Sequence, residues 1–191
     1  QSGAAHNVAR PDFAAEYSER FLAAVGTADL AHLLSKPAPE LLAAQVAVAD
    51  SLTRERITRP DGAAAGIGLP LTPVLDGELL PTQPLDAIRE GSAAEVDLVL
   101  GTTAEEWNLF GVMLSKVQDE ATILRRLGRM VEDPEAMLSA YREARPDLGW
   151  NELWTQLLSD RVFRVPAARL ADAQVAHRPG SVHSYLFSWR S

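Results

Sequence analysis

The chain contains no cysteine, and this absence removes several classes of protein. Without thiols it has no internal disulfide and no metal site built on thiolates. No run of apolar residues approaches the ~18 that a membrane span requires. Basic residues are outnumbered, because 18 Lys and Arg stand against 26 Asp and Glu and leave a net charge of −8. Since nucleic acid is bound by basic stripes, we expect neither nucleic acid nor a membrane as a partner.

Apolar side chains at helical spacing make up most of what the sequence does contain. With 191 residues, 47% of them hydrophobic, the chain is long enough to bury a core. Apolar positions recurring every three or four residues predict helices over residues 11–25, 30–34, 39–49, 85–90, 120–131, 134–144, 150–158 and 165–176. Short apolar runs predict strands at residues 71–75, 96–100 and 182–187, and the run at 96–100 predicts a strand that is buried. Residues 54–68 lack periodicity and predict a loop. Consecutive helices without a strand favour an insertion or cap over a sheet.

The most informative stretch is residues 99–110, VLGTTAEEWNLF. The predicted strand ends in Gly101, and Glu105 and Glu106 follow within a helix that we expect over residues 104–115. In an open parallel sheet, ligands bind beyond the carboxyl ends of the strands, so a carboxylate here is well placed to act on a substrate. The alternative is that both acids lie in the first turn of a helix, where the macrodipole favours negative charge.

Read together with residues 73–81, PVLDGELLP, and with Gly91, this stretch resembles the type-B carboxylesterases, the cholinesterase-like α/β hydrolases. The residues that match the family's strand-end motif are Gly101, Glu105, Glu106 and Phe110. Trp107 departs from it, because the family usually has glycine there. The resemblance implies an α/β fold class: a fragment of an α/β-hydrolase fold, with a few strands of a mostly parallel sheet and a large helical insertion. We expect residues 1–191 to form one partial domain of this fold, in which residues 116–177 are mainly helical.

Both ends of the chain add to the resemblance. Gln1-Ser2-Gly3 is similar to a Q-S-G segment of these esterases whose serine hydroxyl lies against the catalytic acid. The resemblance therefore implies that Ser2 supports that acid, whereas the local alternative is a serine that caps a turn. Residues 159–167 look like the family's D-x-x-F-x-x-P helix, and they precede the strand predicted at residues 182–187.

The resemblance assigns Glu106 as the acid of a Ser-His-Glu triad and leaves Glu105 as its exposed neighbour. In acyl transfer such an acid orients the histidine and stabilises the imidazolium. The chain has no G-x-S-x-G nucleophile motif. Its histidines are His6, His32, His177 and His183. The resemblance places the family's catalytic histidine just beyond Ser191, in a G-x-x-H segment. His183 falls inside a strand-like run, so we expect it to be a sheet or surface residue rather than a base. We therefore expect the chain to supply only the glutamate, to work with the remainder of a hydrolase chain and to be inactive alone.

The resemblance also places Leu109 and Phe110 in the substrate pocket, where Trp107 and Met113 add apolar area. In cholinesterases the position of Leu109 is typically aromatic and binds a quaternary ammonium through its ring. Because leucine has no such ring, we expect a small-molecule substrate that is a neutral, moderately hydrophobic ester. The alternative is that Leu109 and Phe110 are ordinary helix core. We expect no cofactor and no metal.

Two other functions stay open from the sequence. One is a catalytically silent relative of this fold that serves as a partner-binding module. The other is a free-standing helical interaction protein, which would have no parallel strand at residues 96–100. Secreted cholinesterase relatives normally carry disulfides, so the lack of cysteine favours a cytoplasmic, bacterial protein. Secretion is not excluded, because the chain begins with Gln1 rather than methionine.

Overall fold

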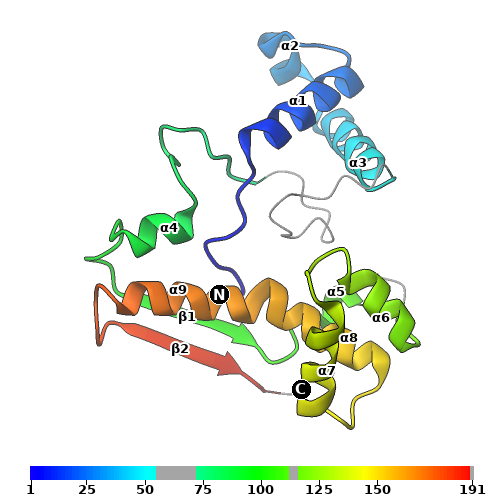
Figure 1. The fold of residues 1–191 in the computed structure, drawn as a ribbon. Helices are drawn as coiled ribbons and strands as arrows, with labels where there is room; N and C mark the ends of the chain where they lie inside the picture. Colours follow the sequence, from blue (N-terminus) through cyan, green and yellow to red (C-terminus); the bar gives the residue numbers. More distant parts are fainter. Residues whose placement is uncertain (55–71, 112–115, 190–191) are drawn as a thin grey trace. The chain divides into compact units, whose positions relative to one another are not determined.

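The computed structural model describes residues 1–54, 72–111 and 116–189 (Figure 1). The chain divides into two compact units. One unit joins Gln1–Ala5 to Leu85–Ser191, and the other is His6–Pro84. The first unit holds the sheet and the stretch with the two adjacent glutamates, so it is the one that bears on the candidate site.

In the unit His6–Pro84 the described residues form three helices, α1 (Pro11–Val25), α2 (Leu30–Ser35) and α3 (Ala38–Arg54). Proline suits the first turn of α1, because an N–H there has no partner within the helix. Gly26 ends α1 with a φ of 79°, a left-handed conformation that glycine adopts without strain. α1 and α3 pack together around the buried side chains Tyr17, Val48 and Leu52.

The prediction of a strand at residues 71–75 is wrong for residues 72–75, the part that the structure describes. Val74 forms an isolated bridge with Ala9, in which the Ala9 N–H donates to the Pro73 carbonyl at 2.7 Å. Proline has no N–H to offer a neighbouring strand, so the pairing does not extend. Most of the loop predicted over residues 54–68 lies outside the described residues.

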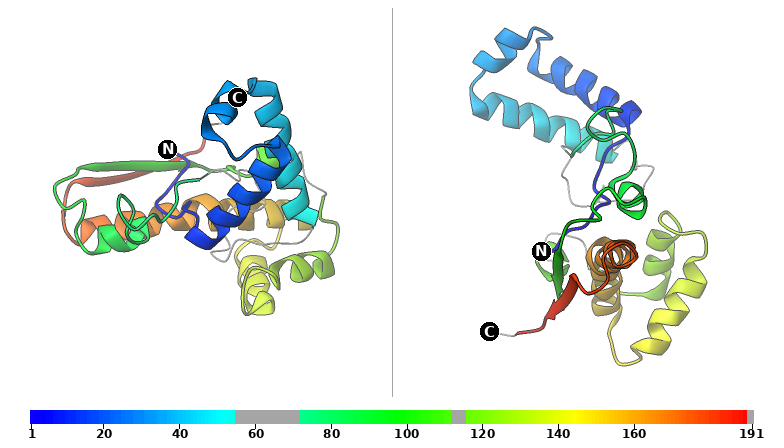
Figure 2. Two further views of the ribbon diagram at one scale, coloured as in Figure 1. Left: turned by 90° about the horizontal axis from the view of Figure 1, so that it is seen from above. Right: turned by 90° about the vertical axis from the view of Figure 1, so that its left-hand side faces the viewer.

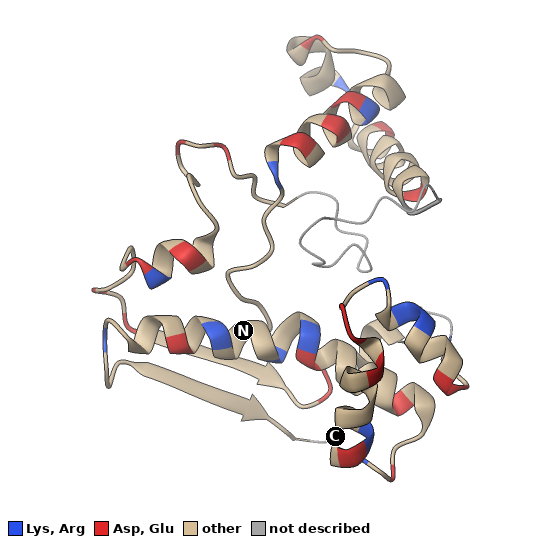
Figure 3. Ribbon diagram, viewed as in Figure 1, with Lys and Arg blue, Asp and Glu red and all other residues tan. Residues whose placement is uncertain are grey.

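Two parallel strands form the sheet in the described part of the other unit, β1 (Leu98–Thr103) and β2 (Val182–Phe187). Their register pairs Leu98 with Val182 and Thr103 with Phe187. Helix α9 (Val165–Val175) packs on both strands and lies along the sheet in the views of Figures 1 and 2. Neither strand carries Lys, Arg, Asp or Glu, and the charged residues of this unit lie on its helices and connections (Figure 3).

The remaining helices are α4 (Pro84–Arg89), α5 (Asn108–Gly111), α6 (Glu120–Leu127), α7 (Pro134–Ala144) and α8 (Trp150–Ser159). α8 runs into α9 through a π-helical stretch, η1 (Asp160–Arg164). Asp119 and Asp133 begin α6 and α7 by accepting a backbone N–H from within the first turn. The apolar side chains buried most deeply among these helices are Ile123, Leu127, Leu153 and Leu157. None of the helices in the described ranges is long and apolar enough to cross a membrane.

Two predictions about the strand-end motif are wrong. The strand runs from Leu98 to Thr103 rather than over residues 96–100, and Val99 is 66% exposed, so the strand is not buried on both faces. Its limits follow the backbone pairing with β2 and not the apolar run. Residues 104–107 form a turn instead of a helix, and α5 begins only after it.

Candidate active site

Glu106 lies in the turn that follows β1, and its carboxylate is held by two hydrogen bonds. The Thr103 N–H donates to Glu106 Oε1 at 2.6 Å, and Ser2 Oγ donates to the same oxygen at 2.7 Å. Glu106 is half-buried, whereas its neighbour Glu105 is exposed and accepts a bond from Asn108 Nδ2 at 2.9 Å. The two adjacent acids therefore have different environments, as the resemblance implied.

Ser2 reaches this carboxylate from the amino end of the chain. Its N–H donates to the Gly101 carbonyl at 2.9 Å, so the backbone of Ser2 is tied to β1. The Ser2 φ of 51° lies in the left-handed region, which costs a residue with a side chain roughly 1–2 kcal/mol. The backbone bond and the hydroxyl bond to Glu106 offset this cost. The structure thus brings together two of the predicted site residues, Ser2 and Glu106.

The predicted pocket residues fall into different environments. Trp107 is 3% exposed and its ring lies 5.2 Å from that of Phe110, while Phe163 stands 6.3 Å from both rings. Such tilted and stacked pairs are favourable arrangements for aromatic side chains. Leu109 is 68% exposed, so it is not core in the described part of the chain. Met113 lies outside the described residues.

Gly101 allows a close approach between the two strands. A Cβ placed on it would lie 2.2 to 2.4 Å from three atoms of the Tyr185 ring, which sits opposite in the register. Carbon atoms in contact are normally about 3.5–4.0 Å apart. The glycine of the strand-end motif is therefore required by packing, because the Tyr185 ring occupies the space of its missing side chain.

Two residues that hold the turn were not among the predicted site residues. Ser159 Oγ accepts the Trp107 N–H at 3.0 Å, and Arg164 Nη2 donates to the Ala104 carbonyl at 3.0 Å. Both lie in the segment noted for its D-x-x-F-x-x-P pattern. That pattern marks the helix but does not tell which backbone group each side chain meets.

No histidine completes a triad within the described residues, where the hydrogen bonds to the Glu106 carboxylate come from Thr103 and Ser2. His183 is an exposed residue of β2, and His177 Nε2 bonds the Arg89 carbonyl at 2.7 Å. Among the residues that the structure describes, no group of three or more metal-binding side chains comes together. The chemistry that this part of the chain offers is that of an oriented carboxylate.

Two known proteins, one of them an esterase by name, are similar in sequence to part of this chain. The chain is 34% identical over 119 residues to the para-nitrobenzyl esterase of Bacillus subtilis, a match that covers 61% of this chain and 23% of that protein. It is 32% identical over 99 residues to the cAMP-regulated D2 protein of Dictyostelium discoideum, covering 50% of this chain and 18% of that one. No protein-family model matches the chain.

Solved structures give the same result over more of the chain. A carboxylesterase of Geobacillus stearothermophilus covers 100% of this chain with a TM-score of 0.72 and 30% identity, and the match spans 38% of that enzyme. A para-nitrobenzyl esterase structure covers 96% of this chain with a TM-score of 0.67 and 28% identity. The chain is therefore related to the type-B carboxylesterases and carries part of an α/β-hydrolase fold. It spans less than two fifths of the length of each of these relatives.

Proposed function

We propose that the protein carrying this sequence is a carboxylic ester hydrolase and that Glu106 is the acid of its Ser-His-Glu triad. The observation that supports this role is the pair of bonds from Thr103 and Ser2 to one carboxylate oxygen at the carboxyl end of β1. The nucleophilic serine and the histidine come from segments outside this sequence, so the chain alone hydrolyses no ester. The relatives named above support esterase chemistry in general.

Both hydrogen bonds end on Oε1 of Glu106. They fix the orientation of the carboxylate and leave its other oxygen, Oε2, available to a histidine. Oε2 is then the atom that receives the imidazole N–H. An acid held in this way keeps the histidine in the tautomer that accepts the serine proton and stabilises the imidazolium that forms.

The test is ester hydrolysis by the intact protein and two matched variants, Glu106→Gln and Glu105→Gln. Para-nitrophenyl and para-nitrobenzyl esters are suitable first substrates, given the name of the Bacillus relative. We expect Glu106→Gln to lower kcat by ~10⁴-fold, the effect of a wrong tautomer in a triad. Glu105→Gln removes an exposed carboxylate one residue away and should leave kcat within a factor of about two, since surface substitutions have small effects. Equal effects of the two substitutions, or no hydrolysis by the intact protein, would refute the proposal.

We further propose that the alcohol side of the pocket is apolar and prefers neutral esters, because Leu109 presents an exposed aliphatic side chain beside the turn. An aromatic ring at this position would attract a quaternary ammonium by roughly 0.5–2 kcal/mol. We therefore expect kcat/KM to be higher for a neutral ester than for a choline ester with the same acyl group. Leu109→Phe should shift this ratio toward the choline ester by about 2- to 30-fold. A wild-type protein that prefers the choline ester would contradict the proposal.

A further inference from the structure

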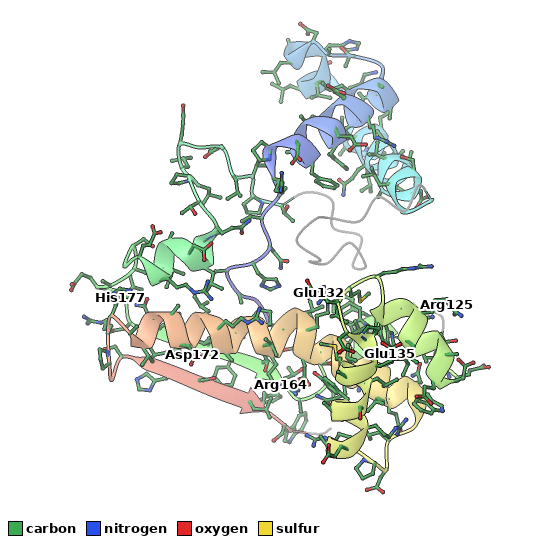
Figure 4. The ribbon with its side chains drawn as sticks, in the orientation of Figure 1. Arg125, Glu132, Glu135, Arg164, Asp172 and His177 are labelled. Atoms are coloured by element: carbon green, nitrogen blue, oxygen red, sulfur yellow. The ribbon has the colours of Figure 1, made fainter. Side chains whose placement is uncertain are left out.

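The turn that carries Glu106 is held at both ends by one stretch of helix. Arg164 Nη2 donates to the carbonyl of Ala104, two residues before Glu106, at 3.0 Å. Ser159 Oγ accepts the N–H of Trp107, the residue after Glu106, at 3.0 Å. The side chains of Ser159 and Arg164 thus bracket the four residues of the turn (Figure 4 labels Arg164).

The π-helical stretch η1 explains how residues five positions apart meet the same turn. In an α-helix, with 3.6 residues per turn, the directions of such residues differ by about 140°. A π turn closes its hydrogen bond one residue later, which brings positions five apart close to one face. The Val165 N–H donates to the Asp160 carbonyl in this pattern. Ser159 and Arg164 can therefore both reach the turn after β1.

The Arg164 side chain is itself fixed by a partly buried network of polar side chains. Its Nη1 is paired with Asp160 Oδ1, and the Asp160 side chain is only 17% exposed. Asp160 also accepts bonds from Tyr141 Oη at 2.9 Å and from Gln156 Nε2 at 3.2 Å. Arginine suits this place, because its planar fork can donate to a carboxylate and to a carbonyl at once.

We propose that Arg164, oriented by Asp160, is a positioning residue that sets the place of the Glu106 carboxylate. It acts through the Ala104 carbonyl and touches neither substrate nor reacting atoms. The kinetic part of this inference rests on the proposed function, whereas the structural part does not. A displaced acid misaligns the histidine, and a misplacement of about 1 Å can lower a rate by as much as 10²-fold.

The experiment uses the intact protein, with Arg164→Met and the matched control Arg169→Met, which makes the same change at an exposed position of α9. Hydrogen exchange is followed by mass spectrometry in a peptide spanning residues 103–107 and in one from β2, residues 182–187. We expect Arg164→Met to speed exchange in the first peptide by roughly tenfold and to leave the second unchanged. Arg169→Met should change neither. Unchanged exchange at residues 103–107, or equal acceleration in both peptides, would overturn the proposal.

Kinetics separate positioning of Glu106 from general loosening. We expect Arg164→Met to lower kcat by ~10- to 100-fold with little change in KM. Added to Glu106→Gln, the same substitution should cost no more than about twofold, because the group that it positions is already lost. Equal losses in both backgrounds would overturn the proposal. If the intact protein shows no hydrolysis that depends on Glu106, the proposed function fails and the exchange measurement alone decides the role of Arg164. If Arg164→Met does not fold, Arg164→Lys is measured in the same way, since it keeps the charge and loses the fork.

Discussion

A methyl group added at Gly101 offers the sharpest test of how the two strands pack. In Gly101→Ala the new Cβ would lie 2.2 Å from the Tyr185 ring, well inside the ~3.5–4.0 Å of a normal carbon contact. The ring must move by more than 1 Å or the strands must separate. Tyr185 is 39% exposed, so its ring can turn toward solvent rather than force the backbone apart. We therefore expect a loss of roughly 1–3 kcal/mol, the range for overpacking, and not a failure to fold.

The assay is urea unfolding of the intact protein, with midpoint and slope compared among four proteins: wild type, Gly101→Ala, Tyr185→Ala and the double variant. Because the clash needs both side chains, Gly101→Ala should cost much less when Tyr185 is already alanine. Gly111→Ala serves as the control, since a Cβ there meets its nearest neighbour at an ordinary 3.7 Å. A Gly101→Ala protein within about 0.5 kcal/mol of wild type, or the same cost in both backgrounds, would show that the ring does not rest on the glycine.

Three further substitutions test other contacts of the intact protein. Ser2→Ala removes one of the two hydrogen bonds that hold Oε1 of Glu106, so we expect the acid to be misplaced and kcat to fall by roughly tenfold, and an unchanged kcat would count against a supporting role. Ser159→Ala leaves the buried Trp107 N–H without its acceptor and should lower the free energy of unfolding by about 1–3 kcal/mol in urea, with an unchanged midpoint as the contrary result. Burial, with the Asp160 carboxylate beside it, raises the pKa of the Tyr141 hydroxyl above its ordinary value of 10.0. The Tyr141 hydroxyl therefore contributes fully to the stability of the fold below pH ~10, and this contribution is lost as the pH rises through the raised pKa. Tyr141→Phe should therefore remove the latest step from the tyrosinate absorbance titration, and loss of an earlier step would refute the assignment.

Elements with strong local signals could be predicted from the sequence nearly to the residue. The helices that begin at Pro11 and Pro134 have the predicted limits, because a proline or an aspartate cap marks where each starts. The strand at residues 182–187 is also confirmed. By contrast, α6 ends at Leu127, four residues earlier than predicted, since Gly128 stops the helix while the apolar pattern continues.

The motif stretch could be predicted in kind but not in detail. Local periodicity favours a helix from residue 104, yet Glu106 turns back to bond the Thr103 N–H and residues 104–107 close into a turn. This bond resembles the one that a glutamate makes in a capping box, where its side chain accepts the N–H three residues earlier. The same contact therefore shapes the turn and orients the candidate acid. The strand limits depend on a partner about 84 residues later in the chain, a separation that no local pattern encodes.

Contacts at long range account for what sequence reasoning missed at the site. The pairing of Ser2 with Glu106 could be predicted only through the family resemblance, because 104 positions separate them. Arg164 meets Ala104 across 60 positions, and nothing in its spacing points to that carbonyl. The π turn itself leaves no clear signal, since the same residues suit an ordinary helix.

The continuous helix formed by η1 and α9 is hydrogen-bonded to the backbone before and after β1. Arg164 reaches the Ala104 carbonyl after the strand, and the buried Gln174 donates to the carbonyls of Ala93 and Val96 before it, at 2.7 and 2.6 Å. The ten residues from Arg164 to Gln174 span ~15 Å along the helix, whereas the eight from residue 96 to residue 104 span ~26 Å in an extended strand. The long side chains of Arg164 and Gln174 bridge this difference in length. A residue inserted into or deleted from β1 would therefore break one of the two attachments. We therefore expect insertions and deletions in homologous chains to fall in the loops that precede and follow β1. Where the length of β1 does change, the length of the helix formed by η1 and α9 should change with it.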